Sequence, residues 1–197
     1  MSDLKSYDLN SVAAELRAGL HLCGQALDLA LGGCTLRLRS NSAGLIEKLE
    51  TYFAHVVAPN EGDPDLDVIA IERGAPDLGV EFKDWTRAPD KIGRKDAYLD
   101  LENGRLVQKV RTGMLFLQSE TQRIAAGPCL QYDSQVINFI NAQYMNWLQH
   151  RGWLICHAAG LVYQGAALGI AGFSGGGKST LMLRQLDRAE VSYLTND

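Results

Sequence analysis

The residues with the clearest chemical potential lie between positions 172 and 179. Gly172 and Gly177 enclose four residues and are followed at once by Lys178 and Ser179. This spacing is typical of a loop that binds phosphate, because glycines let the backbone curl until successive N–H groups point at one anion. A helix that begins after the loop adds its positive N-terminal end. We therefore predict that this segment binds the phosphates of a nucleotide.

The side chains after the glycines have separate roles in such a loop. Lys178 would reach the β- and γ-phosphates, and the hydroxyl of Ser179 would take one coordination position on Mg²⁺. The full set of residues predicted to bind ATP is Gly172, Ser174, Gly175, Gly176, Gly177, Lys178, Ser179 and Thr180. The alternative is a flexible glycine-rich loop that happens to precede a lysine.

A second metal ligand is expected at the end of a hydrophobic strand. The run 191–197 has that form and ends in Asp197, whose carboxylate would lie beside the phosphate loop at the carboxyl end of the strand. The alternative is an ordinary solvated chain terminus. His157 is placed at the end of another predicted strand, and a single histidine in such a place is more often structural than functional.

The predicted loop needs a strand before it and a helix after it. Ala166–Ala171 is a short apolar run that predicts the strand, and the apolar residues of 180–186 predict the helix. Two further apolar runs, 153–156 and 161–163, predict buried strands of the same core sheet.

The preceding part of the chain predicts an α+β region that is largely antiparallel. Gly32-Gly33 and Asn103-Gly104 each separate two alternating runs and predict β-hairpins. The other predicted elements are helices that begin at Asn10 or Ser11, at Asn41 or Ser42 and at residue 133, and strands at 67–72, 80–82, 114–118 and 121–126.

Composition excludes several classes of protein. The chain has 197 residues, 46% of them hydrophobic, and a net charge of −4, which argues against disorder and against non-specific nucleic-acid binding. No apolar run approaches the length of a membrane span, and the polar N-terminus is not a signal peptide. The four cysteines are too far apart for a metal knuckle, so we interpret them as reduced, mostly buried thiols of a cytoplasmic protein.

The pattern changes between Ala126 and Asp133. We therefore predict an α/β protein with an α+β region at 1–130 and an ATP-binding domain at 131–197.

Three segments together resemble a known family. His157-Ala158-Ala159-Gly160, the loop Gly172–Thr180 and Leu194-Thr195-Asn196-Asp197 are similar to the C-terminal catalytic domain of HPr kinase/phosphorylase and of the HprK-related kinases. The resemblance covers residues 153–197. The preceding region resembles the less defined N-terminal part of HprK-related proteins, with subgroup B as a candidate.

The resemblance implies an ATP-dependent kinase with a P-loop fold like that of phosphoenolpyruvate carboxykinase. Its cofactors would be ATP and Mg²⁺, and its acceptor a hydroxyl of a protein or small molecule. By position, Lys178 and Ser179 would hold phosphate and Mg²⁺. Asp197 would match the second acid, as metal ligand or catalytic group, and His157 would match the histidine near the acceptor.

This sequence departs from the family in two ways. HPr kinases have two acids where this chain has Asn196 and Asp197, and an amide cannot act as a general base, which puts HPr itself and the reverse reaction in doubt. The chain also ends soon after Ser179. We therefore expect a fragment with an exposed strand edge that favours aggregation or a homo-oligomer, and this chain alone can lack activity.

Three functions follow from these observations. The first is a kinase that transfers the γ-phosphoryl group of ATP to a hydroxyl, and the second is a nucleotide-binding sensor or regulatory ATPase without transfer. The third is a non-enzymatic interaction domain, which the Lys178-Ser179 pair disfavours.

Overall fold

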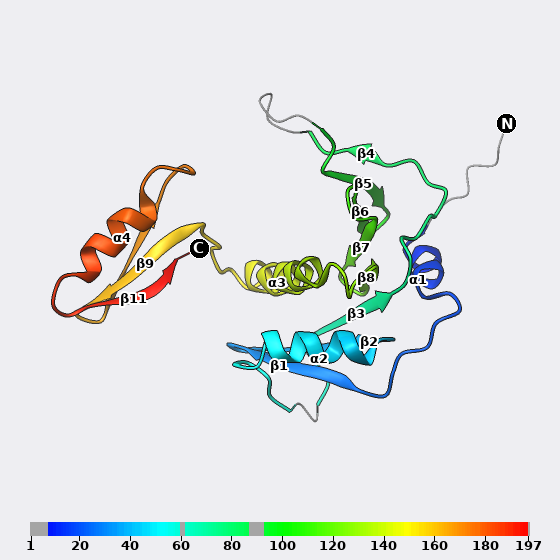
Figure 1. The fold of residues 1–197 in the computed structure, drawn as a ribbon, viewed down its shortest axis with the longest axis horizontal. Coiled ribbons are helices and arrows are strands. Elements are labelled where there is room, and N and C mark those ends of the chain that lie inside the picture. Colours follow the sequence, from blue (N-terminus) through cyan, green and yellow to red (C-terminus); the bar gives the residue numbers. More distant parts are fainter. Residues whose placement is uncertain (1–7, 60–61, 87–92, 197) are drawn as a thin grey trace. The chain divides into compact units, whose positions relative to one another are not determined.

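The computed structural model describes residues 8–59, 62–86 and 93–196 and shows a mixed α/β protein (Figure 1). The chain divides into two compact units, an N-terminal unit of Met1–Trp147 and a C-terminal unit of Leu148–Asp197. No helix in the described ranges has both the length and the apolar character needed to cross a membrane.

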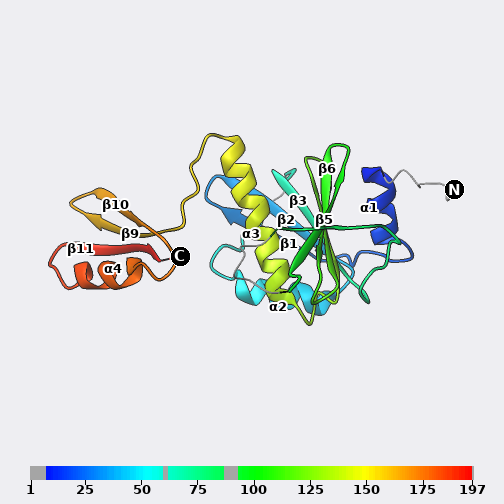
Figure 2. The ribbon, with the colours of Figure 1, turned by 90° about the horizontal axis from the view of Figure 1, so that it is seen from above.

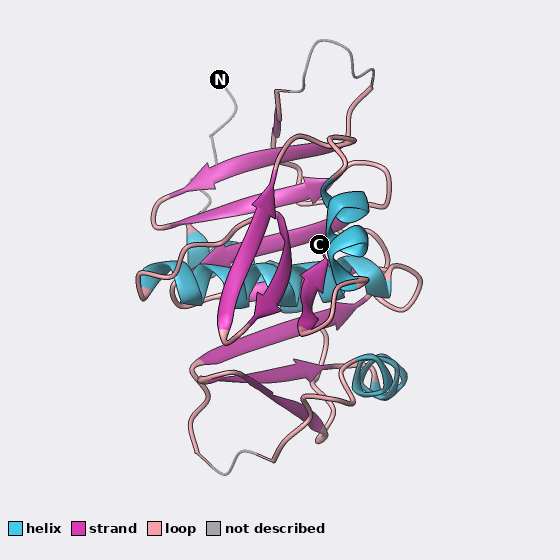
Figure 3. Ribbon diagram, turned by 90° about the vertical axis from the view of Figure 1, so that its left-hand side faces the viewer, coloured by secondary structure: helices cyan, strands magenta, loops and turns pink. Residues whose placement is uncertain are grey.

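The N-terminal unit is built on an eight-stranded mixed sheet, whose strands form the ladder seen in Figure 3. The strand order is β1-β2-β3-β8-β7-β6-β5-β4. The elements are α1 (Leu9–Arg17), β1 (Ala26–Leu31), β2 (Cys34–Ser40), α2 (Ala43–Tyr52), β3 (Leu66–Glu72), β4 (Lys83–Asp84), β5 (Asp96–Leu101), β6 (Gly104–Lys109), β7 (Met114–Ser119), β8 (Arg123–Gly127) and α3 (Asp133–His150).

Helices cover both faces of this sheet (Figures 1 and 2). Strand β3 shows why, because its side chains alternate between two cores. Val68 and Ala70 join the core that contains the buried residues of α2 and α3, whereas Ile69 and Ile71 join the core beneath α1. The apolar stripe of α3, which includes Val136 and Ile140, is therefore part of the N-terminal core.

The C-terminal unit has a three-stranded sheet with one helix on it. Its elements are β9 (Ala158–Tyr163), β10 (Ala166–Ala171), α4 (Lys178–Leu186) and β11 (Val191–Asn196), and the strand order is β10-β9-β11. Met182 of α4 packs on Ala159 and Leu161 of β9. Both outer strands are antiparallel to β9, so β10 and β11 run in the same direction.

Most predicted elements are confirmed, with shifted ends. Both hairpins form, but the second turn is shifted by one residue. Leu101 pairs with Gly104, so Glu102 and Asn103 form the turn, and Asn103 has a φ of +64°. Helix α1 is capped by Asp8, not by Asn10 or Ser11, since the Asp8 side chain accepts hydrogen bonds from both of their N–H groups. The short strand predicted at 80–82 lies at β4 instead.

Two expectations are wrong. Residues 153–156 form no strand. Strand β10 is not buried, because α4 packs mainly on β9; Leu168, for example, is 58% exposed. The N-terminal sheet is largely antiparallel, as predicted, although β3 is parallel to both β2 and β8. The two compact units divide after Trp147, whereas the sequence places the boundary between residues 130 and 131; the buried residues of α3 belong to the N-terminal core.

Candidate functional site

The segment predicted to bind phosphate connects β10 to α4. Strand β10 ends at Ala171, residues 172–177 form an exposed loop, and α4 begins at Lys178. Gly175 and Gly177 have φ angles of +76° and +81°, a region that costs an L-residue with a side chain about 1–2 kcal/mol. The loop therefore reverses direction at two positions where only glycine fits without strain.

Gly176 is required for a different reason, which is close approach of the backbone. Its N–H donates a hydrogen bond to the carbonyl oxygen of Phe173 at 3.0 Å. A Cβ on Gly176 would lie 2.9 Å from that same oxygen, which is closer than real Cβ contacts. The turn that curls the loop thus requires a residue without a side chain at position 176.

Lys178 lies in the first turn of α4 and folds back over the loop. Its Nζ is 3.2 Å from the carbonyl oxygen of Gly172 and 3.5 Å from that of Phe173. The N-cap of α4 is Gly177, which provides no side-chain hydrogen bond to the helix. The positive end of the helix and the ammonium group therefore lie at one loop, an arrangement suited to an anion. The predicted loop residues Ser174, Ser179 and Thr180 are exposed beside them.

Strand register brings the other candidate segments to the same end of the sheet. Ala158 of β9 pairs with Ala171 of β10, so His157 and Gly172 flank one register pair. On the other side of β9, Asn196 pairs with Ala159. Segments that are far apart in the sequence, at 157, 172 and 196, are therefore neighbours at one edge, where the carboxyl ends of β10 and β11 meet.

His157 stands at the start of a strand and not at the end of one. The sequence places it after a strand at 153–156, but β9 begins only at Ala158. The side chain of His157 is exposed. Because β9 is antiparallel to its neighbours, its beginning lies beside their ends, which is why this histidine reaches the loop edge.

Strand β11 contains a bulge that the sequence pattern does not predict. The register between β9 and β11 shifts between Tyr193 and Thr195. Gly160 faces this bulge, and a Cβ there would lie 3.0 Å from Cγ2 of Thr195 and 3.3 Å from Cδ2 of Leu194. Such bulges re-aim the residues that follow them, here the last residues of β11. The glycine at 160 was the signal available in the sequence.

The predicted metal site is described only in part. Ser179 lies in the first turn of α4, but Asp197, predicted as metal ligand and catalytic group, lies outside the described residues. Of Asn196 only the backbone is described. Within the described ranges, no three His, Cys, Asp or Glu residues gather as a metal-binding group. The role of Asp197 stays a prediction.

The geometry thus brings together a glycine-rich loop with one lysine, a histidine beside it, and the end of a third strand. Comparison with family models, with curated proteins and with solved structures finds no match for this chain.

Proposed function

We propose that the C-terminal unit binds ATP at residues 172–180 and belongs to a kinase related to HPr kinase, with the P-loop fold of the HPr kinase and phosphoenolpyruvate carboxykinase type. The observation that supports this most is the strand–loop–helix geometry, in which Gly175 and Gly177 curl the backbone and Lys178 lies over it.

Each residue has a defined part in the proposed reaction. The backbone N–H groups of the loop and the ammonium of Lys178 hold the β- and γ-phosphates and neutralise the charge that develops during in-line transfer. Ser179 and Asp197 would hold Mg²⁺, which supplies further charge neutralisation when it is bound. His157 would lie near the acceptor hydroxyl of a protein or small molecule. A cytoplasmic location fits both the use of ATP and the free cysteines of the chain.

A nucleotide-binding sensor or regulatory ATPase is the second candidate. The observation that favours it is Asn196, because an amide at this place in the sequence cannot accept the proton of an acceptor hydroxyl. Asp197 would then have to serve as both metal ligand and base for transfer to occur.

Nucleotide binding by two variants of α4 tests the shared part of both functions. Lys178→Ala removes the ammonium that would contact phosphate, and we expect it to weaken Mg-ATP binding by about 2–3 kcal/mol in isothermal titration calorimetry. Arg184→Ala is the matched control, because it removes a cation from the exposed surface of the same helix. Equal ATP affinity in Lys178→Ala and wild type would contradict the proposal.

Transfer of label separates the kinase from the sensor. The chain, or a longer natural form of it, is incubated with γ-labelled ATP and candidate acceptors, and label on an acceptor hydroxyl excludes the sensor. Asn196→Asp restores the second acid and should raise the rate of transfer if a base is missing. An unchanged rate would assign the role of base to another residue.

A further inference from the structure

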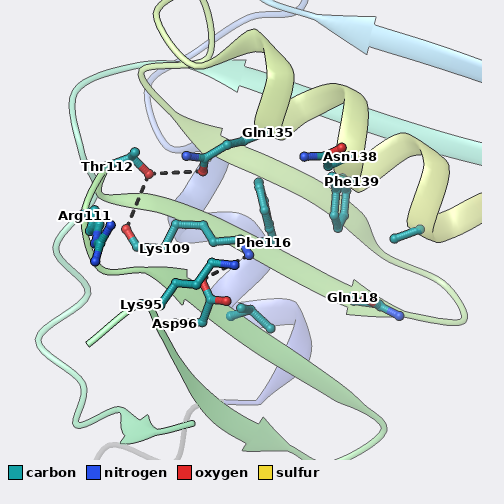
Figure 4. Close-up of a pocket in the computed structure, with 12 residues that line it drawn as sticks. Lys95, Asp96, Lys109, Arg111, Thr112, Phe116, Gln118, Gln135, Asn138 and Phe139 are labelled. Carbon is teal, nitrogen blue, oxygen red and sulfur yellow. Dashed lines mark hydrogen bonds and ion pairs between the residues drawn. The ribbon is translucent and has the colours of Figure 1, made fainter. Parts of the chain in front are cut away.

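A cavity of about 410 Å³ lies in the N-terminal unit between α3 and strands β5–β7 (Figure 4). All of its lining residues are described, and they come from α3, from the three strands and from the turn between β6 and β7. A volume of this size suits a small organic molecule. Most of the lining side chains are polar or charged, which is unusual for a packing defect between a helix and a sheet.

One of the cations in the cavity already has a partner. Nζ of Lys109 is 3.1 Å from Oδ1 of Asp96, and it also lies 5.7 Å from the centre of the Phe116 ring. Figure 4 shows these side chains converging in the middle of the cavity. The charge of Lys109 is therefore balanced and its position fixed.

Two other cations are not balanced in this way. Lys95, just before β5, and Arg111, in the turn after β6, are both exposed. Among the residues that the structure describes, neither side chain has an acidic partner within 4.0 Å. The cavity therefore carries more positive than negative charge, although the whole chain has a net charge of −4. A local excess of one sign in a recess attracts a ligand of the other sign.

The opposite side of the cavity provides a neutral surface. The rings of Phe116 and Phe139 stack with centroids 4.9 Å apart and an interplanar angle of 22°. Gln135 accepts a hydrogen bond from the Thr112 hydroxyl at 3.1 Å, which orients its amide group with the nitrogen still available to donate. Asn138 adds a second amide at the same wall.

We propose that this cavity binds a small organic anion, with its phosphate or carboxylate group at Lys95 and Arg111 and its apolar body against Phe116 and Phe139. The two cations supply charge-assisted hydrogen bonds, and the amides of Gln135 and Asn138 fix the orientation. This site is separate from the nucleotide loop, and the inference does not rest on the proposed kinase function.

The test is calorimetric titration of the full chain with two probes, phenyl phosphate and benzoate, with neutral phenol as the control ligand. We expect at least one anion to bind, phenol not to bind, and the stronger anion to identify the charged group. Lys95→Met and Arg111→Met should each weaken binding about tenfold, while Lys83→Met, which removes an exposed lysine of β4 outside the cavity, should change it less than twofold.

Lys178→Ala separates this site from the nucleotide loop. We expect the variant to bind the probe as wild type does, even if ATP binding is lost. The inference is overturned if neither anion binds at millimolar concentration, if phenol binds as well as the anions, or if both cavity substitutions leave the affinity unchanged. It is also overturned if Lys178→Ala abolishes probe binding, because the probe would then occupy the loop. Thermal unfolding of each variant verifies that the exposed substitutions leave the fold intact.

Discussion

Replacement of Gly176 by alanine tests whether the curl of the loop matters for binding. The new Cβ would lie 2.9 Å from the carbonyl oxygen of Phe173, whereas ordinary contacts begin near 3.4 Å. The oxygen must therefore retreat by about 0.5 Å. That movement lengthens the 3.0 Å hydrogen bond between the Gly176 N–H and this oxygen to the limit of a useful contact.

The size of the effect follows from the value of that bond. A backbone hydrogen bond contributes about 0.5–1.5 kcal/mol net. Its loss lowers the equilibrium constant for the curled loop by about two- to twelvefold, and the apparent dissociation constant for Mg-ATP rises by up to the same factor. Because the loop is exposed, global stability should change little.

Calorimetric titration with Mg-ATP measures this factor. Gly169→Ala is the matched control, since it lies in β10 and a Cβ there meets nothing within 4 Å; we expect its affinity to stay within about twofold of wild type. Gly175→Ala, with its φ of +76°, should weaken binding more, by about five- to thirtyfold, from the 1–2 kcal/mol cost of that conformation. Wild-type affinity in both loop variants would refute the reasoning.

Three further predictions concern thiols, the core and acid stability. Burial raises the pKa of Cys129 to about 12, whereas Cys156 is exposed and Cys23 is half-buried. Ellman's reagent should therefore react fast with Cys156 and reach Cys129 only in denaturant. A fast phase that survives replacement of both Cys23 and Cys156 by serine would contradict this. Gln143 is 2% exposed, and its amide nitrogen has no hydrogen-bond partner among the described residues. Because Gln143→Met removes this unpaired buried group, it should raise the free energy of unfolding measured in urea by about 1 kcal/mol. A decrease would contradict this. A hydrogen bond from Lys48, at 2.9 Å, lowers the pKa of Asp133. Its contribution to stability is present above the usual carboxyl pKa and is lost as the pH falls through the lowered pKa. The urea midpoint of Lys48→Met should therefore depend less on pH in acid than that of wild type, and an unchanged pH dependence would contradict the assignment.

Local chemistry explains what the sequence could predict. The Gly-Gly and Asn-Gly pairs predict hairpins because tight turns need a positive φ angle. Gly32 and Asn103 have one, and both hairpins form, although the second turn lies at Glu102 and Asn103. Ser42 caps α2 as expected, since its hydroxyl accepts a hydrogen bond from the N–H of Leu45. These features depend on neighbouring residues alone.

The features that the sequence could not predict depend on contacts between residues that are distant in the chain. The parallel contacts of β3 with β2 and β8 join segments that are distant in the chain, and no local signal specifies them. The apolar run at 153–156 resembles a strand but finds no partner. The amphipathic pattern of α3 predicts a buried stripe, yet it does not say which core that stripe joins.

The candidate sites also combine features set by neighbouring residues with features set by long-range contacts. The loop at 172–177 can be predicted because its glycines lie within one short segment. That His157 lies beside this loop follows only from the register of β9 and β10. The cavity was missed because Lys95, Arg111 and Gln135 are separated in sequence and meet only when α3 crosses the sheet.

The central claim is that the phosphates of ATP bind against the loop from Gly175 to Ser179, in which the N–H of Gly176 donates to the carbonyl oxygen of Phe173. The most direct measurement is a titration of the ¹⁵N-labelled chain with Mg-ATP, followed by amide chemical shifts, with adenosine as the control ligand. We predict the largest shifts at Gly175, Gly176, Gly177 and Lys178, and almost none there with adenosine. Saturating Mg-ATP that leaves these four amides unmoved would contradict the account.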